Sequence, residues 1–254
     1  MNRKRILLLA ASSFSFLIMM ACSPTREIPT SEFRALESVY HETDGDNWYD
    51  NRGWMTETPA CQWYGVQCED GHVVGLTLNW NQLRGELPSE ISDLAKLQTL
   101  TLYYNELTGP MPEEISHLAM LEVLILHNNH FDGGIPAAYG NLQNLRHLDL
   151  VLSNLSGAIP PELGQLSKLE IFNIKGNEFR GAVPAELGQL QGLEALYLSN
   201  NQFSGGIPEE IAGLPNLKLF SIYGNPNIGY VPQSLLDLPD TAADYLNFSQ
   251  ANDD

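Results

Sequence analysis

Apolar residues recur in this chain with a period of 24 residues. One copy reads LQTLTLYYNELTGPMPEEISHL over residues 97–118, and residues 99–103 alternate polar and apolar side chains. Such alternation predicts a strand with one buried face. Each copy ends with a glycine and, three residues later, a proline: Pro88, Pro112, Pro136, Pro160, Pro184, Pro208 and Pro232. A single copy cannot bury its own apolar face, so the period predicts a solenoid of stacked parallel strands.

A polar column accompanies the apolar positions. Six copies carry asparagine four residues before the glycine and one carries serine: Asn81, Asn105, Asn129, Ser153, Asn177, Asn201 and Asn225. An amide side chain can bond backbone groups of a turn that stacking would otherwise leave unpaired. We expect a local adjustment at Ser153, with Asn154 helping. The return segments, such as PEEISHL, are too short for a full helix and predict a single helical or 3₁₀ turn.

The repeated pattern LxxLxLxxNxLxGxIPxxLGxLxxL at residues 73–238 resembles the leucine-rich repeat. The resemblance is to the 24-residue form found in plant receptor ectodomains and polygalacturonase-inhibiting proteins. It implies an α/β solenoid of seven repeats, with a parallel sheet on the concave face and short helical or 3₁₀ turns on the convex face. It also implies binding of protein or glycan partners, without catalysis and without a cofactor. Because one fold serves many functions, that role is an expectation by analogy.

The segment before the repeats, residues 30–72, looks like the N-terminal cap of this family. Residues 30–41 place Phe33, Leu36, Val39 and Tyr40 on one helical face, behind Thr30 or Ser31 as candidate N-cap. The resemblance implies a disulfide between Cys61 and Cys68 that closes the cap.

Two further segments belong to the ends of the solenoid. Asp44, Asp46 and Asp50 lie in a sequence that lacks the glycine and the terminal acid of a calcium-binding loop, which favours a cap turn and no metal. Residues 239–254 are expected to form a C-terminal cap and acidic tail, with Tyr245, Leu246 and Phe248 folded back as a lid.

The first residues have the layout of an export signal. Three basic residues at 3–5 precede a largely apolar run at 6–20, too short for a comfortable membrane span. The sequence Met19-Met20-Ala21-Cys22 resembles a bacterial lipobox, with methionine where leucine is usual. The resemblance implies a signal peptide at 1–21, lipidation of Cys22, a tether at 22–29 and an outer-membrane lipoprotein. A simple cleaved signal and an uncleaved anchor are the alternatives, and the side of the outer membrane it faces stays open.

The charge of the chain restricts its partners. The net charge is −18, with 31 acidic residues against 13 basic ones. This excludes nucleic acid and anionic lipid surfaces as partners, so a membrane is reached only through the lipid anchor.

The strand positions that alternate away from the core form the candidate binding surface. Neighbouring strands lie about 4.8 Å apart, so seven of them present a face roughly 30 Å long. Exposed aromatic and aliphatic side chains commonly mark an interaction site, although some could pack on one another instead. The candidates are Trp80, Tyr103, Tyr104, Ile125, His127, Val151, Leu152, Tyr197 and Tyr223.

The sequence contains no convincing catalytic or metal-binding constellation. His127 and His147 are expected on adjacent strands but roughly 13 Å apart along the sheet, and no nucleophile accompanies His147 and Asp149. We therefore expect a non-enzymatic module of the cell envelope that binds a protein partner. The alternatives are a polysaccharide- or ice-binding protein and an inhibitor of a secreted hydrolase.

Overall fold

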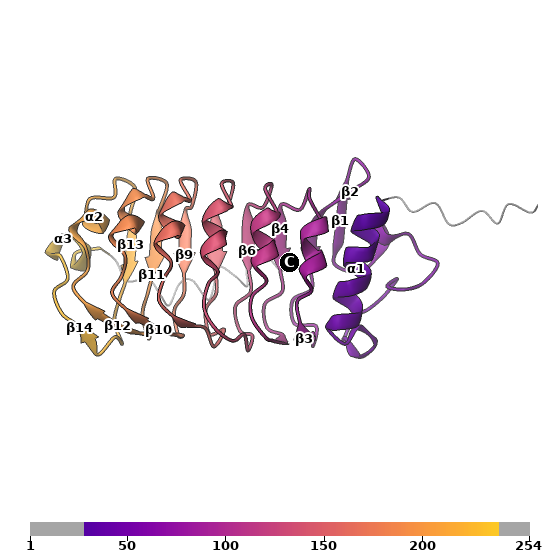
Figure 1. The fold of residues 1–254 in the computed structure, drawn as a ribbon, viewed down its shortest axis with the longest axis horizontal. Helices are drawn as coiled ribbons and strands as arrows, with labels where there is room; N and C mark the ends of the chain where they lie inside the picture. Colours follow the sequence, from indigo (N-terminus) through magenta and orange to yellow (C-terminus); the bar gives the residue numbers. More distant parts are fainter. Residues whose placement is uncertain (1–27, 239–254) are drawn as a thin grey trace, which may run out of the picture.

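The computed structural model describes residues 28–238, which form a rod of stacked repeats. Figure 1 shows the repeats side by side along the long axis, with the short helical turns aligned on one side of the rod. The predicted solenoid is therefore confirmed. The predictions for residues 1–27 and 239–254, among them the signal peptide, Cys22 and the C-terminal lid, lie outside the described residues.

The main sheet runs the length of the rod. It contains β1 (Val66–Glu69), β2 (His72–Thr77), β4 (Thr99–Thr101), β6 (Val123–Ile125), β7 (His147–Asp149), β9 (Ile171–Asn173), β11 (Ala195–Tyr197) and β13 (Leu219–Ser221), in that order. β1 pairs antiparallel with β2, and the later strands are parallel with a constant offset, as in Leu76 opposite Leu100. The constant offset places equivalent residues of successive repeats in continuous rows.

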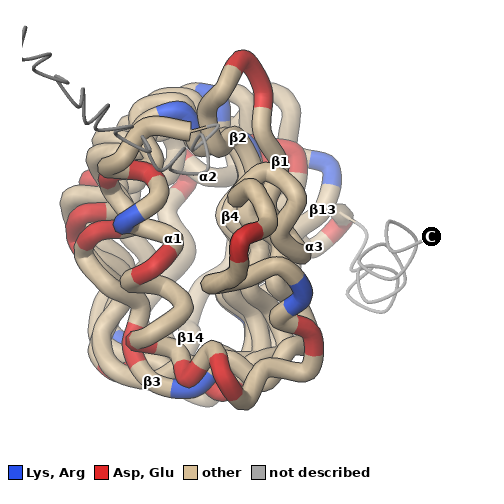
Figure 2. Tube along the Cα trace, turned by 90° about the vertical axis from the view of Figure 1, so that its right-hand side faces the viewer, with Lys and Arg blue, Asp and Glu red and all other residues tan. Residues whose placement is uncertain are grey.

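The opposite side of the rod carries the short helical turns that the return segments predicted. They are the 3₁₀ helices η3 (Ser89–Asp93), η4 (Glu113–His117), η5 (Ala137–Asn141), η6 (Pro161–Gln165) and η7 (Ala185–Gln189), followed by α2 (Glu209–Ala212) and α3 (Gln233–Leu236). Viewed along the rod in Figure 2, these turns and the main sheet enclose the interior. The interior is filled by apolar columns, one of which is fully buried in successive repeats at Leu83, Leu107, Phe131, Leu155, Phe179 and Phe203.

A further set of strands, which the sequence did not predict, follows the turn after the main sheet. β3 (Arg84–Glu86) pairs with β5 (Glu106–Thr108), and a four-stranded sheet contains β8 (Ser156–Gly157), β10 (Glu178–Gly181), β12 (Gln202–Gly205) and β14 (Asn227–Ile228). Their side chains are largely polar, so no long alternation marks them in the sequence. They appear because the extended chain after each asparagine lies beside its copy in the next repeat.

The asparagine column forms a ladder of buried hydrogen bonds. Asn105 donates to the carbonyl oxygens of Leu78 and Leu102, each at 2.8 Å, and accepts from the backbone N–H of Asn81 at 2.9 Å. Each amide therefore joins its own turn to the preceding repeat, as predicted. At the exception, the Ser153 hydroxyl donates to the carbonyl of Leu126 at 3.1 Å. The adjustment there is also confirmed, because Asn154 donates to the carbonyl of Phe131 at 3.1 Å.

The cap helix α1 (Thr30–Glu42) packs across the first repeat, close to its predicted bounds. Its N-cap is Pro29, without a side-chain cap bond, so the prediction of Thr30 or Ser31 was wrong. The helix is instead tied down by Glu32, which is buried and accepts from the backbone N–H of Val73 at 2.8 Å. A carboxylate in the first turn suits the helix dipole and makes a side-chain cap dispensable.

The rest of the cap contains η1 (Gly45–Asn47), η2 (Ala60–Gln62) and the predicted disulfide. Cys61 and Cys68 are bonded, with 5.5 Å between their Cα atoms. Beneath the disulfide, Trp48, Trp54 and Trp63 are all buried and pack on one another. This aromatic cluster closes the end of the core.

Candidate ligand-binding surface

Two rows of residues that follow the ends of the main-sheet strands continue the outward face of the sheet. The strand row comprises the residues two positions before the asparagine column: Asn79, Tyr103, His127, Val151, Lys175, Ser199 and Tyr223. The turn row comprises the residues directly before that column: Trp80, Tyr104, Asn128, Leu152, Gly176, Asn200 and Gly224. Both rows run along the rod because the strands are in strict register.

The whole turn row has a left-handed backbone. Its φ angles are 55° at Trp80, 54° at Tyr104, 50° at Leu152 and 71° at Gly176, and the other members are also positive. Glycine and asparagine accept this conformation easily, whereas bulky residues in it cost of order 1–3 kcal/mol each. Trp80, Tyr104 and Leu152 therefore sit where the backbone disfavours them. Sequence patterning could have signalled the geometry, because the other four positions are asparagine or glycine.

The predicted site residues divide into exposed and buried ones. Trp80, Leu152 and Tyr223 are 55%, 54% and 45% exposed, and Tyr104 and Ile125 are half-buried. The other four candidates are buried: Tyr103, His127, Val151 and Tyr197. These four offer little surface to a partner and support the exposed residues from beneath.

The aromatic candidates of the first three repeats form one cluster. The rings of Trp80 and Tyr104 lie parallel with 3.7 Å between centroids, and Tyr103 stacks on His127 at 4.5 Å. Tyr104 also meets His127 edge-on at 5.2 Å. These rings pack on one another, which is the alternative to a fully exposed patch, and this packing fixes the position of the exposed indole.

His127 is held neutral by its surroundings. Burial, and to a smaller extent the charge of His147, lowers its pKa to about 4. Burial also lowers the pKa of His147 to about 4. The amide nitrogen of Asn128 lies 2.8 Å from Nδ1 of His127, so in the neutral ring Nδ1 accepts and Nε2 carries the proton. The strand row is therefore uncharged at this point.

The far half of the face has a different character. The ammonium of Lys175 lies over the ring of Tyr223, 5.2 Å from its centroid, and Ser199 and Ser221 are buried and hydrogen-bonded to each other. Asp149 is buried and accepts from the backbone N–H of Val151 at 3.1 Å. The exposed apolar surface is thus concentrated in the first four repeats, with Tyr223 as an outlier.

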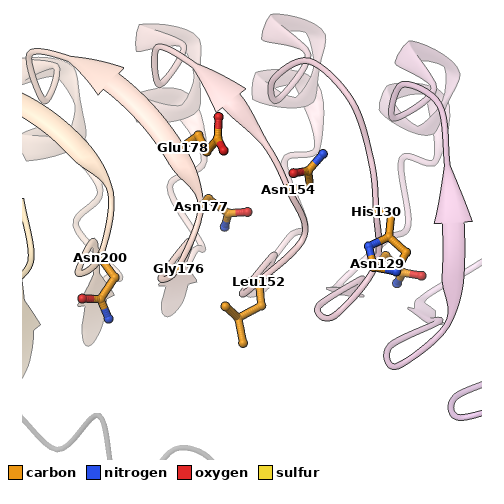
Figure 3. Close-up of a pocket in the computed structure, with 8 residues that line it drawn as sticks. All are labelled: Asn129, His130, Leu152, Asn154, Gly176, Asn177, Glu178 and Asn200. Atoms are coloured by element: carbon orange, nitrogen blue, oxygen red, sulfur yellow. The ribbon is translucent and has the colours of Figure 1, made fainter.

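Two hollows open beside the turn row. The larger, of about 480 Å³, surrounds Leu152 and Gly176 and is shown in Figure 3, where Leu152 projects away from the ribbon. A side chain at Gly176 would collide with Leu152, because a Cβ there would lie 2.6 Å from the leucine Cδ2. The smaller, of about 250 Å³, is lined by Tyr49, Trp80, Gln82, Tyr104, Asn105, Glu106 and Asn128. Tyr49, Gln82 and Glu106 were not among the site residues predicted from the sequence.

Asp46 and Asp50 of the cap interact with side chains of the cap itself. Asp46 accepts from the hydroxyl of Tyr40 at 2.8 Å, and Asp50 pairs with Arg52 at 2.7 Å. Across residues 28–238, no three side chains of histidine, cysteine, aspartate or glutamate gather into a metal-binding group. In the same range, no helix is long and apolar enough to span a membrane.

Known proteins resemble the chain in sequence and in fold. A plant ice-binding protein is 25% identical, with 84% of this chain and 76% of that one covered and a TM-score of 0.73. The Arabidopsis receptor kinase HAESA, solved with a peptide hormone and a co-receptor, is 31% identical, with 82% and 36% covered and a TM-score of 0.71.

Among curated relatives, polygalacturonase inhibitor 1 of Arabidopsis thaliana is 36% identical over 59 residues, which are 22% of this chain and 18% of that protein. The matched segments thus span less than a fifth of the curated relatives. Residues 75–233 match the family described as a leucine-rich repeat region, and this match covers more than half of the chain. The chain belongs to the leucine-rich repeat family.

Proposed function

We propose that the chain is a non-enzymatic binding module that recognises a protein partner through the exposed sheet face. The observation that carries the proposal is the turn row, where Trp80, Tyr104 and Leu152 occupy left-handed positions that asparagine or glycine would occupy without strain. Two of these side chains are more than half exposed. A strained backbone that turns an apolar side chain toward solvent does not stabilise the isolated chain. A partner that covers this apolar surface explains why such residues occupy the turn row.

The length and chemistry of the face favour a protein. Exposed side chains run from Trp80 on the first repeat to Tyr223 on the seventh, a distance of roughly 30 Å at ordinary strand spacing. That length suits an extended peptide or a protein edge. The exposed anchors are uncharged, whereas the chain carries −18 overall, so the contact is mainly apolar and hydrogen-bonded. HAESA, solved in complex with a peptide hormone, supports a peptide or protein as the partner.

Two alternative functions are each suggested by a known protein that resembles this chain. The fold is similar to a plant ice-binding protein, and part of the sequence is similar to a polygalacturonase inhibitor. A regular array of threonine is confined to two repeats, where Thr101 donates to Thr77 at 3.2 Å. The sheet face is otherwise irregular, which disfavours ice. Inhibition of a secreted hydrolase is one form of the protein binding proposed here.

We also propose that the protein is an exported bacterial outer-membrane lipoprotein. The support is the sequence around Cys22, together with similarity to solved receptor ectodomains. Cys22→Ser is expected to move the protein from the membrane fraction to the soluble fraction. Membrane fractionation that is unchanged by this substitution would refute lipidation.

The binding proposal is tested by capture. The immobilised full chain and a variant with Trp80, Tyr104 and Leu152 all changed to asparagine are exposed to envelope proteins. Asparagine suits the left-handed backbone, as Asn128 and Asn200 show, so the variant keeps its fold. A partner retained by the native chain and lost by the variant supports the sheet face. Equal capture by both proteins would move the site elsewhere.

A further inference from the structure

The smaller hollow lies where the cap meets the first two repeats, and three aromatic rings surround it. Tyr49 comes from the cap, Trp80 from the first repeat and Tyr104 from the second. Tyr49 and Trp80 are 73% and 55% exposed. Because Tyr104 covers one face of the indole at 3.7 Å, the exposure of Trp80 belongs mainly to its other face. The hollow thus has flat aromatic surfaces turned toward solvent.

The rings are held rigidly. The backbone N–H of Tyr49 donates to the carbonyl of Asn81 at 3.2 Å, and the side chain of Asn81 exchanges two hydrogen bonds with the backbone of Asp50. The tyrosine hydroxyl accepts from the amide of Gln82 at 2.9 Å. The cap segment is therefore fixed against the first repeat, and a ligand would lose little freedom of the protein on binding.

The backbone around the hollow is left-handed at four positions, and three of them carry residues that this conformation disfavours. Trp80, Gln82, Tyr104 and Asn128 all have positive φ, from 54° to 57°. Such conformations in non-glycine residues gather at ligand-binding sites, where the surrounding structure enforces them. Gln82 also has a positive φ, which among the equivalent residues of the later repeats Asn154 alone shares. The extra left-handed residue turns an amide toward Tyr49.

The polar groups between the rings suit hydroxyl groups. Gln82 and Asn128 supply amides, which both donate and accept. Glu106 supplies a carboxylate whose position is fixed by Arg84, with Nε 3.0 Å from Oε2. A volume of about 250 Å³ is smaller than the roughly 300–1,000 Å³ of drug-sized pockets. It therefore suits a single ring.

We propose that this hollow binds one pyranose ring of a neutral oligosaccharide. The C–H groups of one sugar face would lie against Trp80 and Tyr49, and the sugar hydroxyls would bond to Gln82, Glu106 and Asn128. The net charge of −18 disfavours anionic sugars. The site overlaps the proposed protein contact at the Trp80–Tyr104 pair, whereas Tyr49, Gln82 and Glu106 belong to the hollow and Leu152 does not.

Tryptophan fluorescence of the full chain tests the proposal, because Trp80 is exposed and the other three tryptophans are buried. The probes are cellohexaose, mannohexaose and chitohexaose, with an oligogalacturonate of equal length as the anionic control. We expect at least one neutral probe to shift the emission and to protect Trp80 from acrylamide quenching. The oligogalacturonate is expected to have no effect.

Three substitutions locate the site. Tyr49→Ala is expected to weaken binding about tenfold, because one stacking surface is lost. Tyr49→Phe keeps the ring and is expected to bind nearly as the native chain does. Leu152→Asn, outside the hollow, is expected to leave sugar affinity unchanged. Thermal unfolding of each variant checks that it is folded.

The proposal would be overturned if none of the neutral probes bound, if the oligogalacturonate bound as well as they did, or if Tyr49→Ala bound with native affinity. Loss of sugar binding in Leu152→Asn would also contradict it. None of these results affects capture of a protein partner through Leu152, so this proposal and the protein-binding proposal can fail separately.

Discussion

The indole of Trp80 lies parallel to the ring of Tyr104, with 3.7 Å between centroids and 11° between planes. Both residues have a left-handed backbone. The stack recovers part of the conformational cost, since aromatic pairs contribute about 0.5–1.5 kcal/mol beyond simple burial. It still leaves the indole 55% exposed, so the arrangement serves the surface more than the core.

Leu152 provides the clearest test of backbone strain. Its φ is 50° and its side chain is 54% exposed. Leu152→Asn is expected to raise the free energy of unfolding by about 0.5–1 kcal/mol, because asparagine tolerates the left-handed region. Urea denaturation measures this, with Ser204→Asn on the surface of β12 as a control for the new side chain. A clear loss of stability at position 152 would mean that the leucine packs productively.

The asparagine ladder is expected to be a major source of stability. Asn129 donates to the carbonyls of Leu102 and Leu126 and accepts from the N–H of Leu107 at 3.1 Å. Asn129→Ala leaves these buried groups without their partner and is expected to cost about 2–4 kcal/mol. Asn129→Ser is expected to cost less, because Ser153 already performs part of this role. Equal costs for the two variants, measured by urea denaturation, would contradict this account.

Stability is expected to depend on pH through His127. Its pKa is about 4 in the folded chain and about 6.5 when unfolded. The unfolded state therefore binds a proton first, so stability is complete above pH 6.5 and falls as the pH drops toward 4. The loss approaches about 1.4 kcal/mol per pH unit within this window.

Thermal unfolding at pH 7, 6 and 5 measures the effect. His127→Gln removes the titrating group and is expected to weaken the dependence of stability on pH. The dependence that remains is attributed to His147, whose pKa is lowered in the same direction. An unchanged profile in His127→Gln would show that this imidazole titrates normally in the folded protein.

The disulfide is expected to stabilise the cap. Cys61 and Cys68 are separated by 7 residues, and closing a loop of this size contributes about 2.5 kcal/mol in the chain-entropy description. The double variant Cys61→Ser, Cys68→Ser should lose about this amount in urea denaturation. Reductant is expected to produce the same loss in the native chain and none in the variant; loss in both would indicate another origin.

The solenoid could be predicted from the sequence because every repeat obeys the same rules. A buried apolar residue at the position of Leu100 recurs in every copy, and a bonded asparagine at the position of Asn105 recurs in all but one, so one set of local preferences fixes the whole core. The second set of strands could not be predicted, since it arises from the stacking of polar segments. The N-cap prediction failed because α1 is held by the buried carboxylate of Glu32. This carboxylate accepts from the backbone N–H of Val73, which lies 41 residues away in the sequence.

The candidate site was only partly predictable for a related reason. Alternation identified which residues face outward, but Tyr103 and His127 cover each other across repeats and are buried. Tyr49 was missed because it reaches the site through the turn at Asn81, far along the chain. Non-repeated contacts carry no period, so a pattern in the sequence cannot show them.

The proposal that the turn row binds a protein partner is tested by comparing stability and affinity in one variant. In this variant, Trp80, Tyr104 and Leu152 are all replaced by asparagine. The affinity for a captured protein partner and the free energy of unfolding are measured together. If the turn row binds the partner, the variant will have native or higher stability and its affinity will fall about 100-fold or more, as expected when a central apolar cluster is removed. Unchanged affinity in a stable variant would show that the turn row is not the binding surface.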